Sequence, residues 1–318
     1  MIRVRPSVVR DFLMAAKDNK TQVLPSVRAL LADAIDYAGL FPPSQLSMSE
    51  AVINYALNVA GRNNWMLGRF VLPVSRLSEF LDIASHYFSQ AGHKGWRLSV
   101  LAGENINETV RQIVNFNEQN APNVVIDSLE VKANTVSKIE NTVGLLPQNL
   151  TTYFEIGISD NFVDLVSTLA FRGQRAKIRT GGVVPEDFPK SAEIIKFVRA
   201  CVAANVPFKA TAGLHHPIRC FRPLTYAANG PKGTMHGFLN LFLMTGFARE
   251  SFKKKRLEEL MEEEFDEVFR FEPDKIHWRD QNTLTMPQIE QLRLTGITSF
   301  GSCSFDEPVT DLQGLGIL

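Results

Sequence analysis

The sequence lacks an excess of either charge, and it lacks a long apolar run. Lysine and arginine together number 34, and aspartate and glutamate together also number 34, so the formal net charge is zero. Electrostatic recruitment to nucleic acid or to a membrane surface is therefore not expected. The most apolar run, residues 238–248, is interrupted by Asn240 and Thr245 and is too short to span a bilayer. We therefore expect a small-molecule partner, and neither nucleic acid nor a membrane.

Cysteine is scarce as well, with only Cys201, Cys220 and Cys303 in 318 residues. An odd number at wide spacing argues against a disulfide framework, provides no metal-ligating pair and favours a reducing compartment. The residues before Lys17 include no apolar segment of the length that a secretory signal requires. We therefore expect a cytoplasmic protein, and the sequence leaves open whether it forms a homo-oligomer.

Short apolar segments alternate with amphipathic ones along most of the chain. The segments typical of strands are residues 66–72, 97–102, 123–127, 152–158, 176–181, 208–213, 268–271 and 297–302. Helical periodicity falls between them, at residues 75–88, 105–117, 136–145, 162–171, 191–204, 237–264 with a break near Ser251, and 286–294. Eight strands with helical crossovers predict an α/β fold, a (β/α)8 barrel of the TIM type, and the alternative is a doubly wound α/β sheet.

The N-terminal residues precede this alternation. They have helical periodicity over 26–38 and 47–60, separated by a Pro42-Pro43 corner. We therefore expect residues 1–62 to be an N-terminal helical extension packed on the barrel and residues 63–318 to be the barrel. Segment 36–43 is expected to form a hydrophobic plug in which Asp36 caps a neighbouring group, and the alternative is a lid over the barrel mouth.

The segment 177–217 carries cationic side chains where apolar ones are expected. Strand alternation puts Lys177 and Arg179 on one face of the first strand, and Lys209 lies in the second strand. Central parallel strands are normally near-continuous apolar runs. Because such clusters concentrate at functional sites, we expect these three residues to belong to one. The alternative is a layer of ion pairs inside the barrel that consists of Arg69, Glu155, Lys177 and Lys209.

Reactive groups of such barrels lie at the carboxyl ends of the strands and in the loops that follow. The expected catalytic residues are Lys177, Lys209, Asp127 and Glu155, and the expected substrate-binding residues are Arg69, Arg179, Thr180, Gly181, Gly182, Thr211, Gly213 and His215. The glycines let backbone N–H groups approach an anion, and a guanidinium beside them binds phosphate or carboxylate. Cys303 lies in a segment typical of an exposed loop, and the sequence indicates no base beside it for a nucleophilic role.

Two resemblances to known families accompany these patterns. The whole chain resembles a bacterial family of barrel type through the phrases DYAGLFPP (36–43), KATAGLHHP (209–217) and FGSCSFDEP (300–308), and this resemblance implies no particular activity. The second resemblance is local, and it concerns Lys177-x-x-Thr180-Gly181 followed by Lys209-Ala210-x-x-Gly213. This pair of segments is similar to the paired lysine strands of deoxyribose-phosphate aldolases.

The aldolase resemblance implies specific roles. Lys177 would form a Schiff base with a carbonyl substrate, Lys209 would favour the unprotonated amine, Asp127 would relay protons, and glycine N–H groups would hold the phosphate. Arg179 stands where that family has a small residue, and Ala212 stands where it has glycine. The lysines fall on the fifth and sixth expected strands, whereas that family has them on the sixth and seventh.

Three functions follow as hypotheses. The first is a lyase of aldolase type, or an isomerase, that acts on a small carbonyl or phosphorylated metabolite through the lysine pair and without a cofactor. The second is a lyase or isomerase that depends on a divalent metal ion, with Asp127, Glu155 and His215 as ligands and a lysine as general base. The third is a non-catalytic barrel that binds an anionic metabolite or a protein partner, and it would tolerate loss of both lysines.

Overall fold

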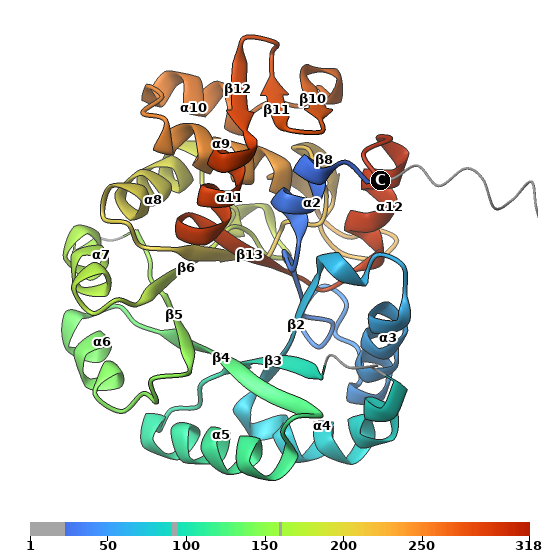
Figure 1. Ribbon diagram of the computed structural model, residues 1–318, viewed down its shortest axis with the longest axis vertical. Coiled ribbons are helices and arrows are strands. Elements are labelled where there is room, and N and C mark those ends of the chain that lie inside the picture. Colours follow the sequence, from blue (N-terminus) through green and yellow to red (C-terminus); the bar gives the residue numbers. More distant parts are fainter. Residues whose placement is uncertain (1–22, 91–94, 159–160) are drawn as a thin grey trace, which may run out of the picture.

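The computed structural model describes residues 23–90, 95–158 and 161–318 of the chain. Eight parallel strands close into a barrel in the order β1, β13, β7, β6, β5, β4, β3, β2 (Figure 1). They are β1 (Ile35–Tyr37), β2 (Leu67–Pro73), β3 (Trp96–Leu101), β4 (Val124–Lys132), β5 (Thr151–Glu155), β6 (Arg175–Arg179), β7 (Phe208–Thr211) and β13 (Ile297–Ser302). The expected (β/α)8 barrel is confirmed, and the open doubly wound sheet is excluded because the sheet closes on itself.

Helices follow the barrel strands and form a ring around them (Figure 1). In chain order they are α3 (Met48–Ala60), α4 (Leu77–Ala84), α5 (Ile106–Asn120), α6 (Val136–Val143), α7 (Phe162–Phe171), α8 (Ser191–Ala203), α9 (Phe238–Arg249), α10 (Lys254–Met261), α11 (Met286–Thr295) and α12 (Asp306–Gly314). The expected break near Ser251 separates α9 from α10. Among the described residues, no helix is both long enough and apolar enough to cross a bilayer.

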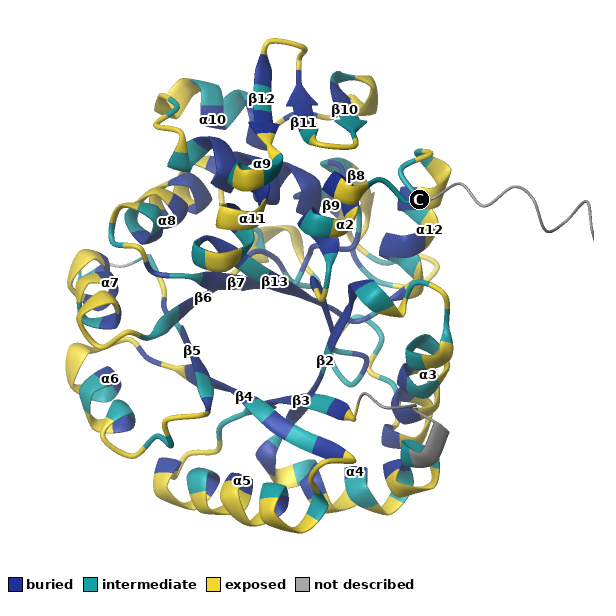
Figure 2. Ribbon diagram, viewed as in Figure 1, coloured by how far each residue is buried: buried dark blue, intermediate teal, exposed yellow. Residues whose placement is uncertain are grey.

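The main hydrophobic core lies between the barrel strands and the surrounding helices, whose outward faces are exposed (Figure 2). For example, Phe197 of α8 packs edge-on against Phe208 of β7, with ring centroids 5.3 Å apart. Phe208 and Ala210 are both fully buried in this core. Because side chains alternate along a strand, Lys209 between them points the other way, into the barrel. The same apolar packing that holds β7 in place therefore directs a lysine inward.

The first barrel strand lies within the expected N-terminal extension. The expected helix over 26–38 is wrong in its second half, because α2 (Pro25–Leu31) ends early and β1 follows it. β1 pairs with β13 on one side and β2 on the other, and Asp33, with φ of 51°, turns the chain between α2 and β1. The barrel therefore begins before the expected boundary at residue 63. Residues 1–22 of the expected extension lie outside the described residues.

The expected strand 268–271 does not belong to the barrel. β10 (Phe269–Glu272), β11 (Lys275–Trp278) and β12 (Asn282–Thr285) form a separate antiparallel sheet outside the barrel ring (Figure 1). A second small sheet, β8 (Cys220–Pro223) with β9 (Lys232–Met235), also lies between β7 and β13 in the sequence. With β1 counted, Lys177 and Lys209 lie on the sixth and seventh barrel strands, not on the fifth and sixth.

Candidate active site

Lys177 and Lys209 lie next to each other inside the barrel. Parallel pairing puts Glu155 of β5, Lys177 of β6 and Lys209 of β7 in register. Glu130 of β4 reaches both amines, because its Oε2 lies 2.6 Å from Nζ of Lys177 and its Oε1 lies 2.7 Å from Nζ of Lys209. One carboxylate therefore bridges the two lysines.

Each lysine also has a carboxylate partner of its own. The Nζ of Lys177 lies 2.7 Å from Oε2 of Glu155, and the Nζ of Lys209 lies 2.5 Å from Oδ2 of Asp36. The hydroxyl of Ser299, on β13, donates a further hydrogen bond of 2.8 Å to the same oxygen of Asp36. Five residues thus form one connected group, which we call the lysine cluster: Asp36, Glu130, Glu155, Lys177 and Lys209.

Burial strengthens the charge interactions at the closed end of the lysine cluster. The side chains of Asp36 and Lys209 are each 1% exposed. Burial alone would lower the pKa of Lys209, but Asp36 and Glu130 together raise that pKa above its ordinary value. Burial alone would raise the pKa of Glu130, yet the two lysines hold it well below its usual range, and Lys209 and Arg69 do the same for Asp36. Lys209 is therefore a fixed cation.

Lys177 lies at the open end of the lysine cluster. With Glu130 and Glu155 it lines a cavity of about 270 Å³ next to the carboxyl ends of β3, β4, β5 and β6. The side chain of Glu155 is 18% exposed, against 6% for Lys177. A small molecule in this cavity would meet the amine of Lys177 and the carboxylate of Glu155 together.

A second cavity, of about 480 Å³, shares Glu155 with the first and is lined by Arg179, Lys132, Gly157 and other residues. Arg179 and Lys132 are exposed at the ends of β6 and β4. Within the described part of the chain, neither side chain forms an ion pair. Two cations without carboxylate partners beside an open cavity suit an anionic group of a ligand.

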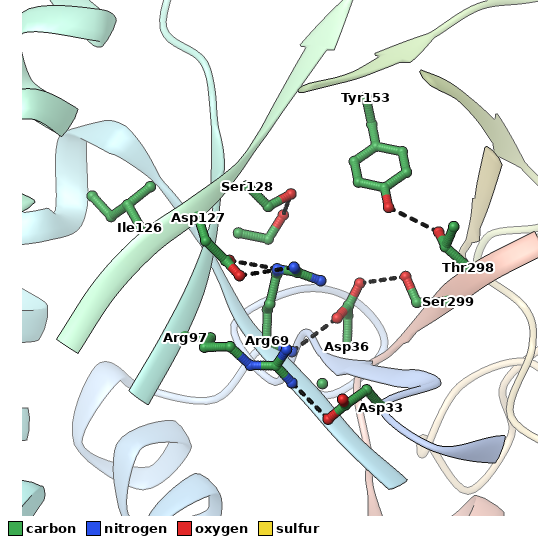
Figure 3. Close-up of polar contacts among 12 residues, drawn as sticks. Asp33, Asp36, Arg69, Arg97, Ile126, Asp127, Ser128, Tyr153, Thr298 and Ser299 are labelled. Atoms are coloured by element: carbon green, nitrogen blue, oxygen red, sulfur yellow. Dashed lines mark hydrogen bonds and ion pairs between the residues drawn. The ribbon is translucent and has the colours of Figure 1, made fainter. Parts of the chain in front are cut away.

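Arg69 and Asp127 form an ion pair beside the lysine cluster, and the backbone N–H of Arg69 donates to Asp36 at 2.8 Å (Figure 3). Nε and Nη2 of Arg69 donate to the two carboxylate oxygens of Asp127, at 2.5 and 2.8 Å. The expected strand 123–127 in fact continues to Lys132, and its pairing with β3 skips Asp127, as in a β-bulge. Asp127 therefore lies in mid-strand, and its side chain engages Arg69. Glu130, further along β4, lies between the lysines, and Asp127, which was expected to relay protons, contacts Arg69 instead.

Other side chains of the protein cover the three glycines that were expected to hold an anion, which are Gly181, Gly182 and Gly213. A Cβ at Gly181 or Gly213 would lie 2.5 or 2.6 Å from the ring of Phe188. A Cβ at Gly182 would lie 2.0 Å from the carboxylate of Asp187, which accepts the N–H of Val183 at 3.2 Å. The carboxylate of Asp187 therefore already accepts a hydrogen bond from the backbone next to Gly182, where an anionic ligand was expected. Anion binding in the described residues is better supported at Arg179 and Lys132.

Thr180 and Thr211 connect the ends of β6 and β7. The hydroxyl of Thr180 donates to the carbonyl oxygen of Ala212 at 2.7 Å, and its N–H donates to that of Thr211 at 2.8 Å. Ala212 and Gly213 both have positive φ, of 65° and 73°, so the chain makes a tight turn directly after β7. This turn positions the residues that follow, which include His215.

His215 lies with Cys303 and Glu307, apart from the contacts of the lysine cluster. Its Nδ1 is 3.9 Å from Sγ of Cys303 and 3.1 Å from Oε2 of Glu307. The expectation that Cys303 is exposed and has no base beside it is wrong, since Cys303 is 4% exposed and contacts an imidazole. The sequence could not show this contact because 88 positions separate the two residues.

The three metal ligands of the second hypothesis have different partners in the fold. Asp127 pairs with Arg69, Glu155 with Lys177, and His215 with Glu307. Across the described ranges, no group of three or more His, Cys, Asp or Glu side chains is arranged to hold a metal ion. Comparison with models of protein families, with curated proteins and with solved structures found no match. The function is therefore inferred from the residues of the site and their geometry.

Sequence reasoning missed Asp36 and Glu130 as members of the site. For Glu130, the sequence contained a strand pattern, because the apolar residues Leu129 and Val131 alternate with polar ones. In the structure these two apolar residues are buried and the polar side chains between them face inward. Recognition of this alternation would have extended β4 to its true end. For Asp36, a three-residue strand is too short to display an alternation that distinguishes it from a helix.

Proposed function

We propose that this protein is an enzyme that forms a Schiff base between Lys177 and a small carbonyl compound, and that it acts as a lyase or an isomerase. The observation that carries this proposal is the position of Lys177, whose amine lies at the wall of a cavity, 2.7 Å from the carboxylate of Glu155. An amine nucleophile needs a nearby group that accepts its proton and a neighbouring cation that favours its neutral form. In this proposal Glu155 accepts the proton, and Lys209, which shares the carboxylate of Glu130 with Lys177, is the neighbouring cation.

The chemistry can be followed proton by proton. The ammonium of Lys177 gives a proton to Glu155, and the free amine attacks the carbonyl carbon. One proton passes from the attacking nitrogen to the former carbonyl oxygen, which gives the carbinolamine. Glu155 then returns its proton to the same oxygen, which leaves as water, so that ammonium and carbonyl compound yield iminium and water. The iminium then withdraws an electron pair from a bond at the neighbouring carbon. Breaking a carbon–carbon bond there gives a lyase, and removing a proton gives an isomerase.

The substrate class follows from the second cavity. Arg179 and Lys132 line it, and Glu155 lines both cavities, so a carbonyl carbon at Lys177 and an anionic tail at Arg179 suit one ligand. Guanidinium binds phosphate and carboxylate through two parallel hydrogen bonds. A small phosphorylated or carboxylated aldehyde or ketone is therefore the proposed substrate.

The aldolase resemblance gives the proposal further support. Lys177 and Lys209 lie on the sixth and seventh barrel strands, the positions that the lysines have in that family. The proposal also accounts for the difference from that family at Arg179, because Arg179, and not the glycines, would bind the anionic group.

Borohydride reduction tests the Schiff base directly. The protein is incubated with a panel of small aldehydes and ketones, with and without phosphate groups, and reduced, and the modified peptide is identified by mass spectrometry. We expect the adduct on Lys177, its loss in Lys177→Met and its retention in the matched control Lys255→Met, which replaces an exposed lysine. Glu155→Gln should slow adduct formation by about 100-fold or more. A panel that leaves Lys177 unmodified throughout would refute the proposal.

A binding protein without catalysis is the second candidate, and the observation that favours it is the pair of cations without ion-pair partners, Arg179 and Lys132, within the described residues. In that case inorganic phosphate or a small phosphorylated compound binds equally well to wild type and Lys177→Met, and binding is lost in Arg179→Gln. The Schiff-base proposal requires the same anion binding and, in addition, the reducible adduct on Lys177. The two candidates are therefore separated by the borohydride result.

A further inference from the structure

A second group of reactive side chains lies where β7 and β13 end. His215 follows β7, Cys303 directly follows β13, and Glu307 lies in the first turn of α12. β7 and β13 are paired neighbours in the barrel, so the segments that follow them meet at the same place on its mouth. The proposed Schiff-base chemistry uses none of these three residues.

Both acidic partners of His215 face the same ring nitrogen. Nδ1 lies 3.9 Å from Sγ of Cys303 and 3.1 Å from Oε2 of Glu307. The hydroxyl of Tyr226 lies 3.8 Å from the same sulfur and 3.0 Å from the same carboxylate oxygen. A protonated Nδ1 therefore stands between two acceptors, and a thiolate at Cys303 would have a cation beside it, while the hydroxyl of Tyr226 donates to Glu307.

Burial makes these contacts strong, because Cys303 is 4% and His215 is 7% exposed. Burial alone would lower the pKa of His215, but Cys303 and Glu307 raise that pKa to about 9. Burial alone would raise the pKa of Cys303, but the contact with His215 brings it below its ordinary value. The two shifts favour the same state, an ion pair between thiolate and imidazolium.

A cavity of about 230 Å³ adjoins this group. Its walls include His215, His216, Tyr226, Glu307 and Arg222, and Cys303 lies behind them, with its sulfur against His215 and Tyr226. Arg222 is exposed on β8, and in the described ranges of the chain its guanidinium makes no ion pair with a carboxylate. The cavity therefore has room for a small molecule, and Arg222, whose side chain also interacts with the thiol of Cys220, can bind an anionic group on it.

We propose that Cys303 and His215 form a second reactive centre, in which the thiolate adds to a small carbonyl compound that carries a carboxylate bound by Arg222. A sulfur lone pair attacks the carbonyl carbon, so that a C–S bond forms and the π electron pair of the carbonyl moves to its oxygen. That oxygen takes the proton from Nδ1 of His215. The products are a hemithioacetal and a neutral imidazole, and no oxidant or reductant is consumed.

Alkylation kinetics test the thiolate. Near pH 6.5 an ordinary thiol with a pKa of about 8.5 is only about 1% ionised. We therefore expect iodoacetamide to modify Cys303 up to about 100-fold faster in the wild type than in His215→Gln. The thiolate absorbance difference between wild type and Cys303→Ser, followed against pH, gives the titration of Cys303 without a change at His215. An alkylation rate no faster than that of His215→Gln, together with a titration at or above the ordinary thiol value, would overturn the proposal.

Selectivity tests the ligand class. Glyoxylate, a small aldehyde with a carboxylate, should protect Cys303 from alkylation at concentrations at which acetaldehyde does not. This preference should disappear in Arg222→Gln and persist in the matched control Arg111→Gln, which replaces an exposed arginine of α5. Equal protection by the two aldehydes in the wild type would refute the assigned ligand class.

The two reactive centres can be tested separately. Protection of Cys303 by glyoxylate should be unchanged in Lys177→Met, because Lys177 contacts Glu130 and Glu155 and not this group. Conversely, the borohydride-trapped adduct on Lys177 should form normally in Cys303→Ser. Loss of cysteine protection in Lys177→Met would show that the carbonyl compound binds at the lysine alone, and it would overturn a separate centre at Cys303.

Discussion

Replacing Glu130 by glutamine should destabilise the fold strongly. Glutamine has nearly the shape of glutamate, but it has no charge and carries one donor group in place of an acceptor. In the wild type, one carboxylate oxygen of Glu130 lies 2.6 Å from Nζ of Lys177, and the other lies 2.7 Å from Nζ of Lys209. The amide nitrogen of Glu130→Gln must therefore face an ammonium group, donor against donor, at a buried site.

The expected magnitude follows from this geometry. Removing one partner of a buried ion pair typically costs about 3–5 kcal/mol, because the remaining charge stays buried without compensation. Asp36 and Glu155 remain to hold one lysine each, so we expect the middle of this range. For 318 residues, an unfolding entropy of about 2 cal/mol/K per residue converts about 4 kcal/mol into a fall in Tm of about 6 °C.

Denaturant titration and thermal unfolding measure this effect. The matched control is Glu79→Gln, which breaks the ion pair with Arg76, where the two side chains are 48% and 33% exposed. An exposed pair of this kind contributes at most about 1 kcal/mol. If Glu130→Gln lost no more unfolding free energy than Glu79→Gln, the bridging carboxylate would not be a principal stabilising element, and our account of the lysine cluster would be wrong.

Further predictions concern pH, the double replacement and the turn after β7. The pKa of Glu130 is depressed in the folded state, so its stabilising contribution is complete above the ordinary glutamate pKa of about 4.3 and is lost as the pH falls towards the folded value. The free energy of unfolding should therefore fall less steeply with decreasing pH in Glu130→Gln than in the wild type. Lys209→Met should cost about 3–5 kcal/mol in denaturant titration, and Lys209→Met combined with Asp36→Leu should recover part of it, because no carboxylate then remains buried without its cation. Gly213→Ala should cost about 1–3 kcal/mol by thermal unfolding, because φ is 73° and its Cβ would meet Phe188 at 2.6 Å, whereas Gly157→Ala, with open space around the site, should change stability by less than about 1 kcal/mol. The double variant should recover only part of the lost unfolding free energy. No recovery at all, or equal effects of the two glycine replacements, would contradict these predictions.

The architecture could be predicted from the sequence because strand and helix alternation is a local pattern. Residues 191–204 were expected to be helical from the spacing of their apolar residues, and α8 occupies nearly the same span. Two of the errors in strand assignment concern segments with weak local signals. β1 has three residues, and β10 is a short antiparallel strand whose partners become clear only in three dimensions.

The candidate site was predictable in part, for a related reason. Lys177 and Lys209 were visible because a charged residue interrupts a short apolar strand, which is a local contrast. Their carboxylate partners were not, since Asp36 and Lys209 are 173 positions apart and nothing near either residue indicates the other. The contact of His215 with Cys303 was invisible for the same reason. The glycines were misleading because Phe188 and Asp187, which lie between β6 and α8 as Gly181 and Gly182 do, fold back over them.

Pairing of β1 with β13 has a consequence for the protein while it is being synthesised. Asp36 emerges 173 residues before Lys209 and 263 residues before Ser299. At about 5–20 residues per second, the nascent chain waits roughly 10–35 s for the lysine alone. Until residues 297–302 have left the ribosome, the growing sheet has two open edges, at β1 and at β7. Unpaired strand edges can pair with strands of other chains, so the nascent chain is exposed to aggregation until β13 has been synthesised.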